Sequence, residues 1–384
     1  MMSLEPSLLQ KHLTAWFLRR TTQNGVRRVD PLSGAVASDI GIVREENQDR
    51  VALSRGKDRL GRVFVVAALA DGIGGMRDGA ECAATTIGCF LGSILEEAQS
   101  NNDDTHQWLL LAVQRTNLMV HTKFRGNGGS TLAAVIVREG GRANWLSVGD
   151  SRIYGSKDSA LLQLSVDDTI AGQLGKLGQS DLDQSRLLQF IGIGESLEPH
   201  IEPLDIASTK AVLLTSDGVH FIAPAPDWLG LIVRHASEPG LCVRRLTELS
   251  KWCGGPDNAS AAMINVASAA NAGTAPAYSC LEVWDPFGET QIIYDIDHRQ
   301  MPSQLQVVSP EPDIQGASVR GSSSVVRNSK KLSDVETSTP PAKKTTARRS
   351  RKSKPGEEKE SKHSDDKSAS QKPELLIEFS NKVG

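Results

Sequence analysis

The chain opens with apolar residues at helical spacing. Within residues 1–32, four of them form one stripe along an otherwise largely polar segment: Leu9, Leu13, Trp16 and Phe17. Such periodicity predicts an amphipathic helix. We interpret residues 1–32 as an N-terminal extension whose helix packs on its own domain, or else docks on a partner or on a membrane surface.

Residues 33–268 have a different pattern, in which apolar runs of strand length are separated by turns and by segments of helical periodicity. The run 63–70 contains no polar residue and ends in an Asp-Gly pair, as expected of a buried strand that enters a turn. Further strands are predicted at 36–43, 132–137, 143–148, 151–154, 210–215 and 261–266. Helices are predicted at 80–98, 108–123, 227–236 and 238–252.

This order favours an α+β layered sandwich, because the regular strand–helix alternation of a doubly wound sheet is absent. Segment 170–205 is rich in Gly and Gln and has weak periodicity, so we interpret it as a small, mobile flap insertion. Residues 269–298 predict an appended β-hairpin, since two strand-like runs flank a turn that contains Pro and Gly. A lone hairpin is marginal in water, so it should dock on the domain or on a partner.

The tail, residues 299–384, is dominated by Ser, Thr, Lys, Pro and Glu. No aromatic residue occurs from 295 to 378, so the tail cannot bury enough apolar surface to offset its ordering entropy and is predicted to be disordered. A small apolar island at 375–379 is either a docking peptide for a partner or a frayed end. The basic stretch 342–354 lacks aromatic residues for base stacking, which favours a solvated tether over a nucleic-acid-binding segment.

Composition refines this picture in three ways. The chain has 384 residues and a formal net charge of -3, and because its tail is basic, the remainder must be clearly acidic. Its five cysteines form no Cys-x-x-Cys pair, which disfavours both a disulfide framework and a zinc site and favours a cytoplasmic location. The apolar runs are too short for a signal peptide or a transmembrane helix, so neither is expected.

Candidate chemistry resides in aspartates that stand beside Gly or Asn at the ends of strand-like runs. Carboxylates gathered from distant turns suit hard cations such as Mg²⁺ or Mn²⁺. Each pair alone is usually an ordinary turn, but the set in this order predicts a metal site. The motifs are Asp71-Gly72, Gly149-Asp150, Asp217-Gly218 and Asp257-Asn258, preceded by the segment 44–49.

These residues resemble the motifs of the PP2C (PPM) family of metal-dependent Ser/Thr protein phosphatases, bacterial type. The resemblance implies an α-β-β-α layered sandwich that hydrolyses phosphoserine or phosphothreonine with water activated at two Mn²⁺ or Mg²⁺ ions. It spans roughly residues 34–268 and is carried by 38–44, 47–49, 71–75, 129–131, 148–154, 164–169, 215–218 and 257–258.

The chemistry of phosphomonoester hydrolysis agrees with this assignment. Asp71, at the end of a buried strand, can bridge two ions, and the glycine after it lets the Gly72 carbonyl approach the second ion. Arg44 would hold the phosphate with its planar guanidinium group. By the resemblance, Asp217 and Asp257 complete the shell of the first ion.

The other site residues also follow from the resemblance. Asp49 would serve the second ion, directly or through waters, and Asp150 would contribute to a third, weaker metal position. Gln48 and Asn258 are expected around these ligands. Asp39 is expected to support the site or, equally, to be a surface turn residue.

Three positions depart from the family pattern. Gln48 stands where many members have Glu, Ile73 replaces a histidine that is a general acid in some relatives, and Asp168 replaces an expected histidine. An alternative is therefore a weakly active or inactive regulatory binding protein on a phosphatase fold. The resemblance also implies phosphorylated proteins as substrates and a cognate Ser/Thr kinase as a partner.

Overall fold

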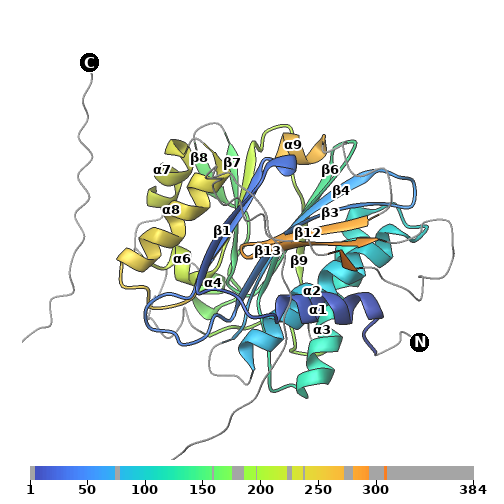
Figure 1. The fold of residues 1–384 in the computed structure, drawn as a ribbon, viewed down its shortest axis with the longest axis horizontal. Helices are drawn as coiled ribbons and strands as arrows, with labels where there is room; N and C mark the ends of the chain where they lie inside the picture. Colours follow the sequence, from blue (N-terminus) through green and yellow to red (C-terminus); the bar gives the residue numbers. More distant parts are fainter. Residues whose placement is uncertain are drawn as a thin grey trace, which may run out of the picture. The chain divides into compact units, whose positions relative to one another are not determined.

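Two antiparallel sheets form the centre of the structure, a computed structural model (Figure 1). It describes residues 5–73, 78–157, 160–174, 186–195, 197–222, 227–236, 238–271, 280–293 and 307–308. All the elements given below belong to one compact unit, residues 1–314.

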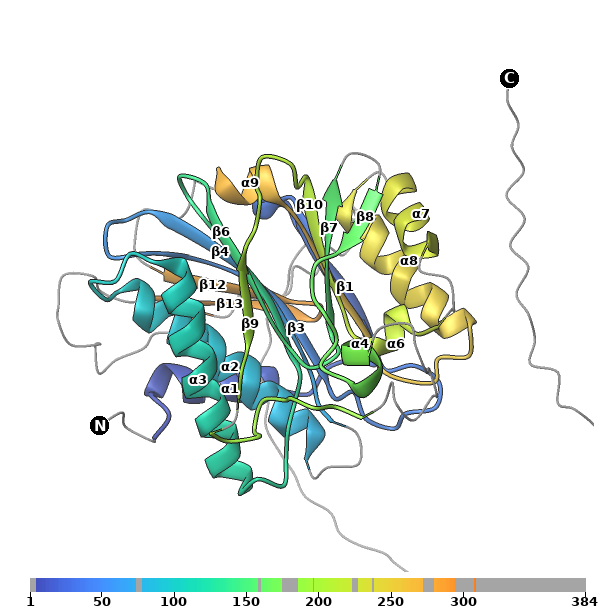
Figure 2. The same cartoon turned by 180° about the vertical axis from the view of Figure 1, so that it is seen from behind.

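The larger sheet has eight strands, and three helices cover its outer face (Figures 1 and 2). In spatial order, its strands are β14 (Val307–Val308), β13 (Gly288–Ile293), β12 (Cys280–Asp285), β3 (Asp49–Lys57), β4 (Val63–Asp71), β5 (Leu132–Arg138), β6 (Arg142–Val148) and β9 (His200–Pro203). The helices are α1 (Leu8–Phe17), α2 (Gly79–Ala98) and α3 (Thr105–Phe124).

The smaller sheet has six strands, and α7 and α8 cover its outer face (Figure 2). In spatial order, its strands are β1 (Asn24–Val29), β2 (Gly34–Asp39), β11 (Ala259–Asn265), β10 (Ala211–Thr215), β7 (Arg152–Lys157) and β8 (Ala160–Gln163). The remaining elements are η1 (Asp30–Leu32), α4 (Ile170–Leu174), α6 (Asp217–His220), α7 (Asp227–His235), α8 (Pro239–Trp252) and α9 (Val266–Ala270).

Three clusters of buried apolar residues lie between the layers and pack them together. Alternate residues of β4 point to opposite faces, so Phe64 and Val66 pack against the helices while Val65 and Ala67 face the other sheet. A third cluster joins the smaller sheet to α7 and α8. This arrangement is the predicted α-β-β-α layered sandwich.

The N-terminal segment packs on the domain that follows it. Leu9, Leu13 and Phe17 are buried in the cluster beneath the larger sheet, so the helix stripe faces its own core. A capping box at Ser7 and Gln10 starts α1. The next strand, β1, was not predicted; it pairs with β2 at the edge of the smaller sheet.

The predicted hairpin forms and docks on the domain. Strand β12 pairs with β13 on one side and with β3 on the other. Leu281, Val283 and Ile292 belong to the main apolar cluster. The hairpin therefore extends the larger sheet, and this pairing stabilises a hairpin that would be only marginally stable alone.

The described part of segment 170–205, the predicted flap insertion, makes specific contacts with the rest of the domain. Ile191 is buried and exchanges backbone hydrogen bonds with Ser130. Asn117 Oδ1 accepts the Gly192 N–H (2.8 Å). Strand β9 then completes one edge of the larger sheet.

Most of the predicted tail, including the motif 375–379 and the basic stretch 342–354, lies outside the described residues. Two of its residues, Val307 and Val308, do form a short strand beside β13. Among the described residues, no helix combines the length and the apolar character needed to cross a bilayer.

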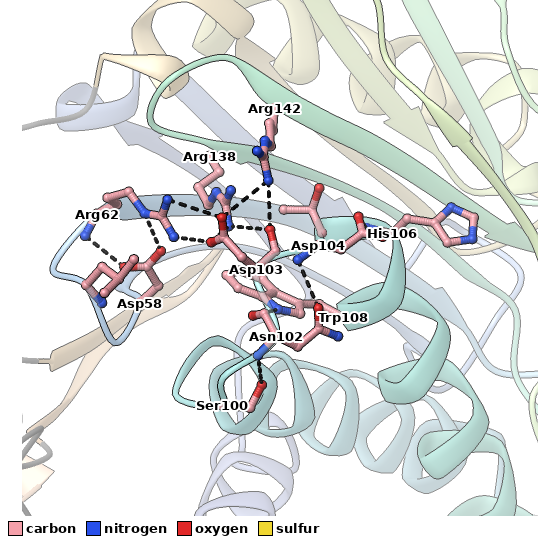
Figure 3. Close-up of polar contacts among 12 residues, drawn as sticks. Asp58, Arg62, Ser100, Asn102, Asp103, Asp104, His106, Trp108, Arg138 and Arg142 are labelled. Carbon is pink, nitrogen blue, oxygen red and sulfur yellow. Dashed lines mark hydrogen bonds and ion pairs between the residues drawn. The ribbon is translucent and has the colours of Figure 1, made fainter.

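A cluster of charged residues connects the loop between α2 and α3 to the strands of the larger sheet (Figure 3). The carboxylate of Asp103 accepts hydrogen bonds from Arg62, Arg138 and Arg142. Arg138 is buried, and its Nη1 also donates to the Asp103 carbonyl (3.0 Å). These arginine side chains donate to acceptors within the protein, so we assign this charged cluster a structural role.

Candidate metal centre

Two neighbouring strands of the larger sheet bring the first pair of carboxylates together. Asp49 opens β3 and Asp71 ends β4, and the antiparallel register sets them directly opposite each other. Opposed side chains on one sheet face are close enough to interact. The backbone of Asp71 is fixed by Thr131, the residue before β5: its N–H donates to Thr131 Oγ1 (3.0 Å), and its carbonyl accepts the Thr131 N–H (2.8 Å).

The next two carboxylates come from one end of two paired strands in the smaller sheet. Asp217 lies two residues after the end of β10, and Asp257 lies two residues before the start of β11. The turn after Asp217 requires glycine, because a Cβ on Gly218 would lie 2.0 Å from the carbonyl oxygen of Asn258. The glycine noted in the sequence therefore lets the two loops approach each other.

A chain of buried serines links the two sheets beside Asp49. Ser216 Oγ donates to Asp49 Oδ2 (2.8 Å) and accepts the Ser260 N–H (2.9 Å). Ser260 Oγ donates to Ser38 Oγ (2.8 Å), which also accepts from Asn47 Nδ2 (2.8 Å). Sequence reasoning did not single out these serines; the one signal was the position of Ser216 between a buried strand and Asp217.

Burial and mutual repulsion both disfavour the charged forms of these carboxylates. Burial raises the pKa of Asp49 to about 6. Burial, followed by the neighbouring carboxylates, raises the pKa of Asp71 and that of Asp217 well above the ordinary value. A proton or a cation among these oxygens relieves that repulsion.

Asp150 lies near enough to belong to the same group. Its charge helps to raise the pKa of both Asp71 and Asp217. Burial, followed by the charge of Asp167, raises the pKa of Asp150 itself to about 6. Arg152 forms a fork with Asp167 through hydrogen bonds of 2.7–3.0 Å and so has a structural role.

Asp168, a departure from the family pattern, holds the turn that carries Asp150. Its Oδ2 accepts the Gly149 N–H (2.9 Å), and its Oδ1 lies 3.0 Å from Nε2 of His200 in β9. The side chain is therefore satisfied by structural partners. This pairing explains how an aspartate is accommodated at a position where a histidine was expected.

Arg44 faces the carboxylates and forms an ion pair with one of them. Its Nη2 donates to Asp257 Oδ2 over 2.6 Å. This hydrogen bond, supplemented by the charges of Asp217 and Asp71, raises the pKa of Arg44. The side chain is 41% exposed, so its guanidinium can be reached from solvent, although in this structure it is bonded to a predicted metal ligand.

Asn258 fixes the loop that carries Arg44. Its Oδ1 accepts the Gln48 N–H (2.8 Å), and its Nδ2 donates to the carbonyls of Ile40 (2.9 Å) and Glu46 (3.0 Å). Asn258 is buried, so these bonds are protected from water. It supports the site through the backbone of the loop.

The other two supporting residues differ in what they contact. Asp39 is buried, accepts the Gly41 N–H (2.9 Å) and pairs with Lys251 (3.2 Å), so it is not a surface turn residue. Gln48 lies against the start of α2, where a Cβ on Gly79 would be 2.7 Å from its Oε1. A Cβ on Gly72 would lie 2.2 Å from the Gly79 carbonyl oxygen.

Several features of this group fit a divalent cation. Its donors are carboxylate oxygens, the ligands that Mg²⁺ and Mn²⁺ prefer. Asp49 Oδ1 is buried with no hydrogen-bond partner, and Gly72 allows the backbone to come close. Within the described residues, however, no three His, Cys, Asp or Glu side chains already have the spacing of an ion site, so binding would require side-chain adjustments.

The chain belongs to the protein phosphatase 2C family, whose model matches residues 43–252, more than half of the sequence. The Ser/Thr protein phosphatase PstP of Mycobacterium tuberculosis is 28% identical over 243 residues, which cover 60% of this chain. That match covers 44% of PstP, so this chain spans less than half the length of that relative.

A solved structure agrees on the fold. The PPM Ser-Thr phosphatase MsPP of Mycobacterium smegmatis, crystallised with cacodylate, is 29% identical with a TM-score of 0.51. That match covers 61% of this chain and 98% of MsPP. The catalytic domain of PstP, 26% identical with a TM-score of 0.49 over 63% of this chain and 98% of its own, has been crystallised with two manganese ions.

Proposed function

We propose that the protein is a metal-dependent phosphatase that hydrolyses phosphoserine and phosphothreonine in proteins. One observation carries the proposal: Asp49, Asp71, Asp217 and Asp257 come from four strand ends and lie near enough for their charges to interact, beside an accessible arginine. Membership in the protein phosphatase 2C family supports the same reaction class.

Each carboxylate has a proposed place in a centre of two Mn²⁺ or Mg²⁺ ions. Asp71 would bridge the ions, with Asp217 and Asp257 on one side and Asp49 with the Gly72 carbonyl on the other; Asp150 would hold a third, weaker ion. Bound ions would supply Lewis acidity and bring the pKa of a water molecule towards neutrality.

The protein's own groups would orient the substrate. Arg44 would exchange its bond with Asp257 for a bidentate contact with two phosphate oxygens, which leaves the Asp257 carboxylate free. Ile73 offers no proton, so the leaving alkoxide would be protonated by water. Phosphorylated proteins are the proposed substrates, a Ser/Thr kinase acting on the same proteins is a proposed partner, and the cytoplasm is the proposed location.

The test is turnover of a phosphothreonine peptide with Mn²⁺, compared with EDTA treatment and with Asp71→Asn and Asp217→Asn. Either substitution should lower turnover at least about 100-fold. Losing a group that only orients a metal ligand costs about 10–100-fold, and losing the ligand itself should cost more. Arg44→Ala should cost less than Asp71→Asn, because Arg44 contributes one charge-assisted contact, whereas Asp71 positions both ions.

Asp30→Asn is a matched control, since Asp30 is exposed and has one weak ion pair with Arg28 (3.5 Å). Activity that survives both chelation and the Asp71 and Asp217 substitutions would contradict the proposal. Calorimetry that detects no Mn²⁺ binding would favour the alternative, a regulatory binding protein on a phosphatase fold.

A further inference from the structure

Arg50 is the residue after Asp49. Its guanidinium group donates hydrogen bonds to backbone carbonyls from two separate parts of the chain. Its Nη1 donates to the carbonyl oxygens of Asn47 (2.8 Å) and Asp49 (2.7 Å). Its Nε donates to the carbonyl oxygen of Phe17 (2.7 Å). One side chain therefore ties the end of α1 to the segment that carries a predicted metal ligand.

The helix end held by Arg50 is itself fastened to the β12–β13 hairpin. Arg19 donates to the Trp16 carbonyl (2.8 Å) and pairs with Asp285 at the hairpin turn (2.7 Å). The Arg19 guanidinium also lies over the Trp16 ring, 3.7 Å from its centroid. Neither α1 nor the hairpin belongs to the segment 43–252 matched by the family model.

A cleft lies beside the Asp49 segment on this side. It has a volume of about 320 Å³ and separates residues 17–23, residues 45–51 and the hairpin turn 285–287, and Arg19, Asp49 and Arg50 line it. Arg50 spans this cleft.

Asp49 depends on its backbone for its position. Its Oδ2 accepts one hydrogen bond from Ser216, and its Oδ1 has no partner. A shift of the 47–49 backbone would therefore move the free oxygen directly. The carbonyl of Asp49 itself is one of the groups that Arg50 holds.

We propose that Arg50 is a positioning residue that sets the placement of Asp49 for metal binding and makes metal affinity depend on α1 and the hairpin. This inference rests on the proposed function through the metal role of Asp49. Elements outside the family segment would thereby influence the centre without contacting an ion.

The test compares Arg50→Met and Arg50→Lys with the wild-type full-length chain by calorimetric titration with Mn²⁺. Arg50→Met should weaken Mn²⁺ binding on the order of 10-fold, the usual effect of removing a group that orients a ligand. Arg50→Lys, which keeps a charge but loses the fork, should fall between. Arg19→Met should cause a smaller shift in the same direction, because it loosens α1 from the hairpin.

Arg28→Met is the control, since Arg28 makes exposed ion pairs and should leave Mn²⁺ affinity unchanged. Thermal unfolding must accompany each titration, and titrations are run well below each midpoint. A lowered midpoint with unchanged Mn²⁺ affinity in Arg50→Met would overturn the proposal, because it would show a purely structural role.

Failure of this inference can be told apart from failure of the proposed function. If the wild-type protein binds Mn²⁺ but does not hydrolyse phosphopeptides, the proposed phosphatase function is contradicted. The calorimetric comparison would still decide the role of Arg50. A wild-type protein that binds no Mn²⁺ would overturn both.

Discussion

The side chain of Ser216 bonds to Asp49 of the larger sheet and to Ser260 of the smaller sheet. It donates to Asp49 Oδ2 and accepts the buried Ser260 N–H. Ser216→Ala should therefore cost about 1–3 kcal/mol of unfolding free energy, because the Ser260 N–H loses its side-chain acceptor. The same variant should need roughly 10-fold more Mn²⁺ for half-maximal turnover.

Urea denaturation and Mn²⁺-dependent turnover measure the two effects of Ser216→Ala. Ser208→Ala is the control, because Ser208 makes solvent-exposed hydrogen bonds to nearby Asp205. Equal stability and equal Mn²⁺ dependence in Ser216→Ala and Ser208→Ala would show that the serine chain is dispensable.

His220 should make the folded protein less stable at acid pH. It is buried, its Nδ1 lies 2.8 Å from Thr215 Oγ1, and its Nε2 has no partner. Burial, aided by the charge of Arg152, lowers the pKa of His220 well below 6.5. Below about pH 6.5 the unfolded chain thus binds a proton that the folded protein excludes, and stability falls by up to about 1.4 kcal/mol per pH unit.

The measurement is the unfolding free energy of the wild type and of His220→Gln between pH 7.5 and 5. The variant lacks this titration, so its stability should fall less steeply on acidification below pH 6.5. His235→Gln, which changes an exposed histidine, should follow the wild-type slope. Parallel curves for wild type and His220→Gln would refute the assignment.

At the residue scale, the sequence predicts the carboxylates better than it predicts their partners. Asp71 and Asp217 were predictable because each follows a buried strand and precedes a glycine, a pattern local to a few residues. The bond between Arg44 and Asp257 joins positions 213 apart in sequence. No local pattern encodes such a contact, so Arg44 could be predicted as a site residue but not as the partner of Asp257.

At the element scale, a buried ion pair decides how the hairpin attaches to the larger sheet. Arg55 of β3 and Glu282 of β12 are opposed in the register and bond over 2.6 Å, with side chains 5% and 7% exposed. Glu282→Ala should cost about 3–5 kcal/mol, because it leaves the Arg55 charge buried without its partner.

Replacing both partners should be far less costly than replacing one. The double variant Arg55→Met with Glu282→Leu keeps the volume and removes both charges, so its unfolding free energy in urea should lie close to that of the wild type. A double variant as unstable as Glu282→Ala would show that specific polar contacts, and not charge balance, hold the hairpin.

Several elements with strong periodicity were predicted close to their observed bounds, whereas β1 at a sheet edge and β3 within the larger sheet were not predicted. The helices predicted at 80–98 and 238–252 occur at Gly79–Ala98 and Pro239–Trp252. Strand β1 was missed because it has a short, mostly polar sequence, NGVRRV, that lies at a sheet edge and alternates between exposed and partly buried positions. Its strand structure depends on pairing with β2, which a local pattern does not reveal.

At the scale of the whole molecule, the layered sandwich followed from the order of elements, but its extent did not. The apolar clusters include Leu9 and Leu13 at one end of the chain and Ile292 at the other. Both segments lie outside 33–268, the range assigned to the phosphatase domain from sequence. The boundary of a core is set by which surfaces find a partner, and that is a long-range property.

The last prediction concerns how much of the chain the fold needs. The three apolar clusters draw on residues between Leu9 and Ile292, and the compact unit ends at Ile314. A chain ending at residue 314 should therefore keep its thermal midpoint within about 2 °C and keep its Mn²⁺-dependent turnover of a small aryl phosphate.

A chain ending at residue 271 should behave differently because it lacks the hairpin. Leu281, Val283 and Ile292 are almost fully buried, and each contributes about 1.5–3 kcal/mol by leaving water. Their combined loss is comparable to the net stability of a typical domain, about 5–15 kcal/mol. Circular dichroism should thus show an unfolded or strongly destabilised 1–271 chain, whereas equal midpoints for the two truncations would show that the hairpin is not part of the core.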